Sequence, residues 1–164
     1  MSIAKRLLLI LCVLVSCVAC DQSTKTYAEA RLPKAQALSL LSDTVRLQVA
    51  HNEGAFLSLG ASAPKPWRLA ALCAGVGAML LALLLYTLFA KGGQGRFVFA
   101  LALVFAGGFS NLIDRFVNEG YVVDFINLGA GPLRTGIFNV ADIAITAGAI
   151  LLVVQAWRGQ QGKA

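Results

Sequence analysis

The chain has 164 residues, of which 58% are hydrophobic and only 13% are charged. Soluble domains carry roughly 25% charged residues, so this composition excludes an ordinary soluble protein. It indicates an integral membrane protein with room for one domain, residues 1–164. The formal net charge of +6 flanks the apolar segments rather than forming a basic patch, so nucleic acid is not an expected partner.

Four uncharged segments are candidates for membrane spans. The first, 7–20, is too short alone and spans only if its helix continues past Asp21 to about Tyr27; residues 21–25 contain no helix breaker. The sequence predicts an all-α membrane protein with four transmembrane helices and a small extracytoplasmic β-sheet cap. The expected spans are about 7–27, 68–90, 96–115 and 135–157, and the cap is formed by 28–67 and 116–134.

The N-terminus also permits a second interpretation. Lys5 and Arg6, an apolar stretch and then Cys17 resemble a lipoprotein signal peptide that ends at a modified cysteine. Three further spans follow, however, instead of a soluble domain. We therefore expect the segment to be retained as the first span.

Basic residues are unevenly distributed about these spans. The two ends of the chain and the short 91–96 loop carry basic residues and no acidic ones, whereas the opposite side carries equal numbers of both. By the positive-inside rule, both termini are expected in the cytoplasm. The basic residues on that side are Lys5, Arg6, Lys91, Arg96, Arg158 and Lys163.

No metal site is expected. The chain has one histidine, His51, and no cysteine pair with the context of zinc ligands. The cysteines fall within apolar segments and are expected to pack as small hydrophobic residues; they are Cys12, Cys17, Cys20 and Cys73.

Two short strands are expected outside the membrane. Residues 45–49 alternate polar and apolar side chains and precede a turn at residues 52–54, and residues 121–126 form a second candidate strand. The two strands are expected to pair into a sheet on the membrane surface. Asp124 alternates with apolar neighbours there and could point toward the plane of Asp142.

Asp142 is the only charged residue between Arg134 and Arg158. A carboxylate within a span costs several kcal/mol unless it is paired, hydrated or protonated, so it indicates chemistry or transport. At 1.5 Å per residue, Asp21, Asp114 and Asp142 lie about 21, 26 and 22 Å from the cytoplasmic edge. Three helices thus bring carboxylates to a common level in the outer third of the membrane.

Asparagines accompany two of these acids. Asn111 precedes Asp114 by three residues and Asn139 precedes Asp142 by three, so each pair is expected to share a helix face. Gly107 and the glycine after it permit close approach of another helix. The alternative is a structural polar cluster that only holds the helices together.

Once other catalytic motifs are excluded, a pair of carboxylates is the remaining candidate for a catalytic group. No metalloprotease, phosphate-loop or dinucleotide motif occurs, and Ser23 and Lys25 do not face each other on a helix. Two close carboxyl groups share one proton, so one can activate water while the other donates a proton. From spacing alone, the partner of Asp142 could be Asp21, Asp114 or Asp124.

Five motifs, in order and spacing together, resemble those of the prolipoprotein signal peptidases (signal peptidase II), bacterial aspartic peptidases of the inner membrane. The motifs are Asp21-Gln22-Ser23-Thr24-Lys25, Asn52-Glu53-Gly54-Ala55-Phe56, Gly107-Gly108-Phe109-Ser110-Asn111-Leu112-Ile113-Asp114-Arg115, Val123-Asp124-Phe125 and Phe138-Asn139-Val140-Ala141-Asp142. The resemblance covers essentially the whole chain. Many members of that family carry one more residue between the glycine and the phenylalanine of the second motif, so this chain departs from the family pattern at Phe56.

The resemblance implies a function and a set of site residues. Asp124 and Asp142 match the catalytic aspartates, and Asp21 and Lys25 match a motif of structural importance. The positions that bind substrate or support the acids are Asn52, Gly54, Asn111, Asp114, Arg115, Asn139 and Ala141. The implied substrate is a prolipoprotein whose cysteine carries a diacylglyceryl group, and the signal peptide is cut just before that cysteine. A globomycin-type inhibitor and membrane lipid are implied ligands, no cofactor is implied, and a monomer suffices.

Two other classes of protein would also carry acids inside a membrane. A proton-coupled transporter or channel subunit uses such residues as relays, but four spans with a large outside cap leave little room for a pathway. A non-catalytic scaffold or lipoprotein is the second rival.

Overall fold

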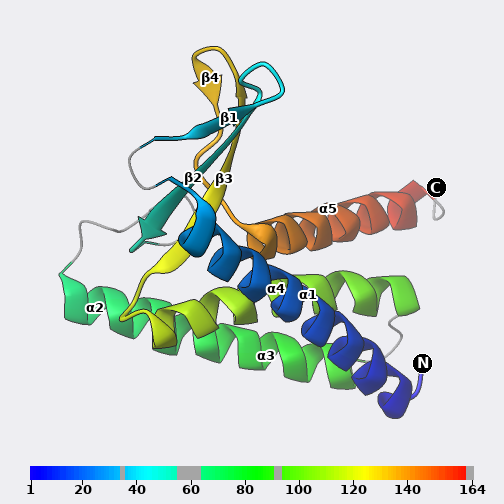
Figure 1. Ribbon diagram of the computed structural model, residues 1–164. Helices are drawn as coiled ribbons and strands as arrows, with labels where there is room; N and C mark the ends of the chain where they lie inside the picture. Colours follow the sequence, from blue (N-terminus) through cyan, green and yellow to red (C-terminus); the bar gives the residue numbers. More distant parts are fainter. Residues whose placement is uncertain (34–35, 55–63, 91–93, 162–164) are drawn as a thin grey trace.

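The computed structural model describes residues 1–33, 36–54, 64–90 and 94–161. Its helices lie together in one bundle, and a small sheet crosses one end of the bundle (Figure 1). Within the described residues, four helices are long and apolar enough to cross a membrane, and the strands form an antiparallel sheet. The expected fold class is confirmed.

The helices extend close to the expected spans, with differences at their ends. The first helix continues through the polar 21–25 segment, as its lack of helix breakers predicted. The second span is continuous over Lys65–Phe89 and includes one stretch of π-helix. The elements are α1 (Ile3–Arg31), α2 (Lys65–Leu69), η2 (Ala70–Gly75), α3 (Val76–Phe89), α4 (Gly95–Val117) and α5 (Val140–Gln161).

The central helix of the bundle is α4. In the most apolar 18-residue stretch of α4, 61% of the residues are buried. In the corresponding stretches of the other three helices the share is at most 17%. Small residues allow close packing: a Cβ at Gly107 would overlap the carbonyl oxygen of Ala141, and a Cβ at Gly148 would lie 2.6 Å from that of Ala100. The backbones of α4 and α5 therefore approach closely both at the start and in the middle of α5.

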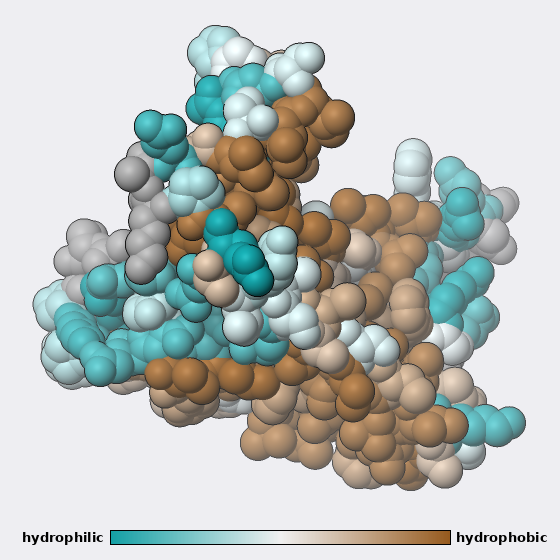
Figure 2. All heavy atoms as spheres, in the orientation of Figure 1, coloured by the Kyte–Doolittle hydropathy of each residue, from teal (hydrophilic) through white to brown (hydrophobic). Residues whose placement is uncertain are grey.

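The outer surface of the bundle is apolar. Large hydrophobic side chains such as Leu8, Val15, Met79 and Val153 are exposed along the helices. Figure 2 shows hydrophobic residues over the middle of the helices and hydrophilic residues toward their ends. This is the surface expected of helices that contact lipid.

Both termini lie at the end of the bundle away from the sheet (Figure 1). Arg6 is one of the basic residues from which the orientation of the spans was inferred. It is buried at this end of the bundle and donates from Nη1 to the carbonyl oxygen of Thr87 at 2.9 Å. The contact satisfies a carbonyl near the C-terminus of α3. It attaches the start of α1 to the end of α3.

The sheet is formed by four strands in the order β1-β2-β3-β4. The predicted pairing of the two candidate strands is confirmed: β2 runs antiparallel to β3, with Asn52 opposite Val122 and Ala50 opposite Asp124. The short outer strands were not predicted. The strands are β1 (Leu38–Leu40), β2 (Val45–Asn52), β3 (Val122–Ala130) and β4 (Leu133–Arg134).

The last helix begins later than the uncharged run that suggested it. The run starts at Thr135, but α5 starts at Val140 because the intervening backbone pairs with β3. The N–H of Thr135 donates to the carbonyl of Leu128, and that of Phe138 to Ile126. The expectation that Asn139 and Asp142 share a helix face is therefore wrong, since Asn139 precedes the helix.

Candidate active site

Asp142 lies in the first turn of α5, where it and Asn139 cap the helix. The Oδ1 atom of Asn139 accepts a hydrogen bond from the backbone N–H of Asp142 at 2.9 Å, and the backbone N–H of Asn139 donates to Asp142 Oδ2 at 3.2 Å. This reciprocal pair is a capping box, here with an aspartate. The helix dipole also favours a carboxylate at this position.

Asp124 lies on β3, and side-chain amides donate to both of its carboxyl oxygens. Asn139 Nδ2 donates to Oδ1 at 2.7 Å, and Asn52 Nδ2 donates to Oδ2 at 3.0 Å. Asn52 is in reach because β2 and β3 pair in the register described above. Asn139 thus contacts both acids, Asp142 through its backbone N–H and Asp124 through its side chain.

Asn111 links the acids to the centre of the bundle. From α4, its Nδ2 donates to Asp142 Oδ1 at 2.9 Å. Its Oδ1 accepts from Asn139 Nδ2 at 3.1 Å and from Lys25 Nζ at 3.0 Å. One amide therefore connects α1, α4 and the start of α5.

Behind this amide lies a buried ion cluster. Lys25 Nζ is 2.6 Å from Asp21 Oδ2 and 2.8 Å from Asp114 Oδ2, and all three side chains are at most 4% exposed. Asp21 Oδ1 also accepts the backbone N–H of Ala141 at 2.8 Å, which satisfies one of the free donors at the start of α5. The cluster holds α1 against α4 and against the first turn of α5.

Arg115 attaches the loop after β2 to α4. Its Nη2 donates to the carbonyl oxygen of Gly54 at 2.8 Å, and its Nη1 donates to that of Asn111 at 3.2 Å. The Gly54 N–H in turn donates to Asn52 Oδ1 at 3.0 Å. The buried Nε of Arg115 has no hydrogen-bond partner within the described residues.

The environment of Asp124 favours its protonated form. Burial is the main cause and, with the charge of Asp142, raises the pKa of Asp124 to about 6, although the hydrogen bonds from Asn52 and Asn139 oppose the shift. Two neighbouring carboxyl groups in such surroundings titrate as a pair.

Two cavities meet at Asp142. One, of about 510 Å³, has apolar walls from η2, α3, α4 and α5, and Asn52, Asn111, Arg115, Asp124 and Asp142 line it as well. The other, of about 520 Å³, lies between the sheet and α5 and is almost wholly apolar apart from Asp142 and two threonines. An apolar cavity with a few grouped polar side chains is typical of a ligand site.

The predicted site residues form one connected network. Asp21 and Asp114, the other two candidate partners of Asp142, both bind Lys25, whereas Asp124 shares Asn139 with Asp142. The members are Asp21, Lys25, Asn52, Gly54, Asn111, Asp114, Arg115, Asp124, Asn139, Ala141 and Asp142. Phe56 lies outside the described residues.

Two further members were not predicted as site residues. Gln22 Nε2 donates to Asp114 Oδ1 at 2.7 Å, and Ser110 Oγ donates to Asp21 Oδ2 at 2.7 Å. Ser110 precedes Asp114 by four residues, so helical spacing could have placed it on the same face. Nothing in the sequence places Gln22, because its contact depends on how α1 is rotated against α4.

The thiols form no part of this network, although Cys73 lies near Arg115. Cys17 and Cys73 pack against the hydrophobic core, and Cys12 and Cys20 are exposed. In the part of the chain that the structure describes, no group of three His, Cys, Asp or Glu side chains is suited to hold a metal ion.

Comparison with known proteins decides the family. The sequence profile described as signal peptidase (SPase) II matches residues 13–158. The chain belongs to the signal peptidase II family. A lipoprotein signal peptidase of Chlorobium phaeobacteroides is 36% identical over 143 residues, 82% of this chain and 81% of that protein. One of Burkholderia mallei is 36% identical over 126 residues, 77% of this chain and 74% of that protein.

The fold agrees with this family membership. A solved bacterial membrane enzyme superposes with a TM-score of 0.77 over 98% of this chain and 92% of its own, at 24% sequence identity. A second structure, also described as a bacterial membrane enzyme, gives 0.72. As a signal peptidase II family member with four helices able to span a membrane, the chain is a multi-pass membrane peptidase.

Proposed function

We propose that this signal peptidase II family member is an aspartic endopeptidase whose catalytic residues are Asp124 and Asp142. One observation carries the proposal. Asn139 donates from its side chain to Asp124 and from its backbone to Asp142, and both acids line the same cavity of about 510 Å³. A buried carboxyl group (Asp124) and a half-buried one (Asp142) that share a donor and a cavity meet the geometric requirement for an acid pair that holds one proton.

The reaction needs one proton on the pair. The ionised acid takes a proton from water, and the water oxygen attacks the peptide carbonyl. The protonated acid donates its proton to the carbonyl oxygen as the tetrahedral intermediate forms. Proton transfer to the leaving nitrogen then breaks the C–N bond. The raised pKa of Asp124, about 6, keeps a proton on it at mildly acidic pH, where an ordinary aspartate is ionised.

The proposed substrate is a prolipoprotein whose cysteine carries a diacylglyceryl group, and the cut falls just before that cysteine. The relatives in Chlorobium and Burkholderia are lipoprotein signal peptidases. The cavity suits such a substrate because its apolar walls match a signal-peptide helix. Its polar lining includes Asn52, Asn111 and Arg115, which can hold a peptide backbone.

We further propose that the protein lies in the bacterial inner membrane with both termini in the cytoplasm and the acids near the outer face. The termini lie at one end of the bundle and the sheet crosses the other (Figure 1). The short basic segments at the terminal end favour the cytoplasm. The chain would act as a monomer without a cofactor, and a globomycin-type inhibitor would occupy the cavity.

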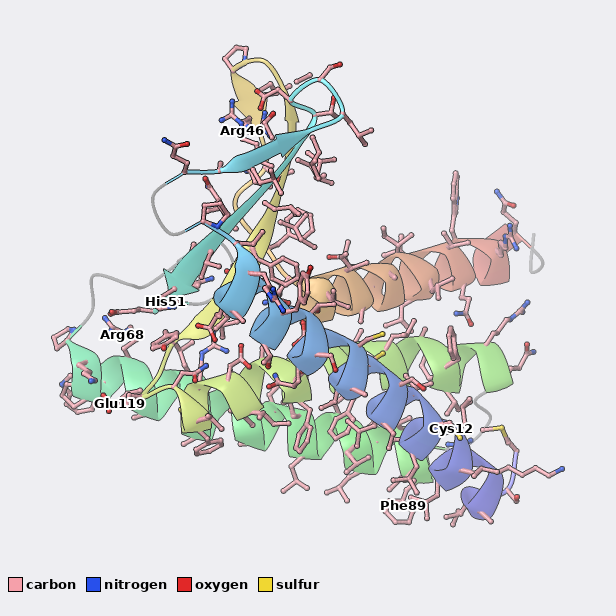
Figure 3. The ribbon with its side chains drawn as sticks, in the orientation of Figure 1. Cys12, Arg46, His51, Arg68, Phe89 and Glu119 are labelled. Carbon is pink, nitrogen blue, oxygen red and sulfur yellow. The ribbon has the colours of Figure 1, made fainter. Side chains whose placement is uncertain are left out.

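Cleavage of a diacylglyceryl-modified precursor by purified protein in detergent tests the proposal. Asp124→Asn and Asp142→Asn should each abolish release of the signal peptide while leaving the protein folded. Asp43→Asn is the matched control, because Asp43 pairs with Arg46 in the turn between β1 and β2, at the far end of the sheet (Figure 3).

Activity retained in either active-site variant would contradict the acid pair. Cleavage of a precursor without the lipid at an equal rate would contradict the proposed substrate. Absence of cleavage by the unmodified protein, with its fold intact, would contradict the function as a whole.

A further inference from the structure

The proposed chemistry gives Lys25 no role, although each of its three N–H donors has an acceptor. An ammonium group has three N–H donors and no acceptor. In Lys25, Nζ lies 2.6 Å from Asp21 and 2.8 Å from Asp114, and the third contact is the Oδ1 atom of Asn111 at 3.0 Å. The Lys25 side chain is 4% exposed, so water does not compete for these donors.

This third contact determines which way the amide of Asn111 faces. The amide has an acceptor end and a donor end. With Oδ1 toward Lys25 and Asn139 Nδ2, Nδ2 points at Asp142 Oδ1 at 2.9 Å. The reversed amide would place its NH₂ group against the ammonium and against the other amide, and its carbonyl against the carboxylate. All three of these contacts are repulsive.

We propose that Lys25 is a positioning residue: through Asn111 it keeps Asp142 as the ionised acid of the pair, so that Asp124 carries the shared proton. The inference rests on the proposed function and goes beyond it, because it assigns the two roles. Asp142 is the base that activates water, and Asp124 is the acid that donates to the carbonyl oxygen.

The surroundings of the two acids support this division. Asp142 receives N–H donors from Asn111 and Asn139 and lies at the N-terminus of α5, where the helix dipole favours negative charge. Asp124 lies on a strand, where no such dipole acts. A carbonyl turned toward Asp142 would instead require a proton on that acid.

Other charged groups also face the pair and must be separated from the effect of Lys25. Asp21 on α1 and Asp114 on α4 bind Lys25 directly. Arg115 on α4 interacts electrostatically with both acids, and Cys73 lies near that arginine. A test must therefore distinguish orientation of the amide from a simple change in charge.

The first experiment measures kcat/KM against pH for Lys25→Met. Asn111 Oδ1 then keeps only the donor from Asn139, so reversal of the Asn111 amide costs less than in the unmodified protein. Reversal favours protonated Asp142, so the acid limb of the profile should move upward by about one pH unit. The matched control is Lys5→Met, which removes the same charge from an exposed position in the first turn of α1 and leaves Lys25 and Asn111 in place. Its profile should not move.

A double variant separates orientation from charge. Lys25→Met alone leaves two buried anions and can prevent folding. Adding Asp21→Asn removes one negative charge with the positive one, so the cluster regains its original net charge. The side-chain oxygen of the introduced asparagine can still accept the N–H of Ala141, and the hydroxyl of Ser110 can accept instead of donating. The upward shift should persist in this variant.

An unchanged profile in both lysine variants would overturn the proposal and assign Lys25 a purely structural role. A shift in the single variant that disappears in the double variant would also overturn it, because charge alone would then explain the effect. Infrared titration of the protonated carboxyl band in the same variants needs no substrate. It tests the positioning role even if the protein cleaves no prolipoprotein, which would contradict only the proposed function.

Discussion

Asn139 and Asp142 hold each other in position across the start of α5, each accepting a hydrogen bond from the backbone N–H of the other. The same asparagine donates its side-chain NH₂ group to Asp124. One residue therefore both caps a membrane helix and links two acids. These two tasks use different atoms, so they can be separated by substitution.

Substitution of Asn139 should separate helix capping from activity. Asn139→Ser retains an oxygen that can cap the N–H of Asp142 but loses the donor to Asp124, whereas Asn139→Ala loses both. Alanine should therefore cost about 1 kcal/mol more in the free energy of unfolding than serine. Both variants should lose at least tenfold in kcat/KM. Thermal unfolding in detergent and precursor cleavage measure the two effects; equal stability of the variants would contradict the capping role.

Close packing at Gly107 should be required for the geometry of the acids. Gly107→Ala would press a methyl group into the carbonyl of Ala141, and overpacking of this kind costs about 1–3 kcal/mol. Cleavage should fall as well, since Asp142 follows Ala141 directly. Gly77→Ala is the control, because its Cβ would lie 3.8 Å from Leu112, an ordinary contact. Similar unfolding temperatures for the two variants would argue against tight contact of α4 and α5.

Activity should fall as pH rises above the pKa of Asp124, about 6. Below that pH Asp124 holds its proton, and above it the pair becomes doubly ionised and lacks an acid. We expect kcat/KM to decline about tenfold per unit once pH is well above 6. Initial rates with a diacylglyceryl-modified precursor at constant ionic strength would measure this. A profile that stays level up to pH 8 would contradict a proton on Asp124.

Arg6 should contribute to stability as well as to topology. Its buried guanidinium donates to carbonyl oxygens of Thr87 and Leu88, and hydrogen bonds to charged groups contribute about 1.5–3 kcal/mol. Arg6→Met should lower the free energy of unfolding by about this amount. Lys5→Met removes the same charge from an exposed neighbour and should have little effect. Equal loss in both variants would mean that charge, rather than the contact, matters.

Much of the fold was predictable because hydropathy is a local property. Apolar runs located four spans, and alternation in residues 45–49 and 121–126 located the two long strands. The start of α5 was not predictable in this way. Residues from Thr135 onward are uncharged, and that is compatible both with a helix and with an extended segment. They form strand-like hydrogen bonds with β3 only because β3 lies beside them.

The sequence predicted which residues belong to the candidate site better than it predicted which of them contact one another. Spacing brought Asp21, Asp114 and Asp142 to one level but left the partner of Asp142 open, and only the resemblance pointed to Asp124. In the structure Asn139, whose side chain reaches β3 from just before α5, contacts both Asp124 and Asp142. Short outer strands such as Leu133–Arg134 are too brief to leave a periodic signal.

The order of residues along the chain, by itself, determined which segments are apolar enough to cross a membrane and which polar residues they carry. Packing between helices decided what those polar residues do. Asp21 accepts an N–H from Ala141, 120 residues away, and Lys25 reaches Asn111 on another helix. Such contacts depend on how helices rotate and approach one another. No local pattern encodes that, because it follows from the burial of the whole bundle.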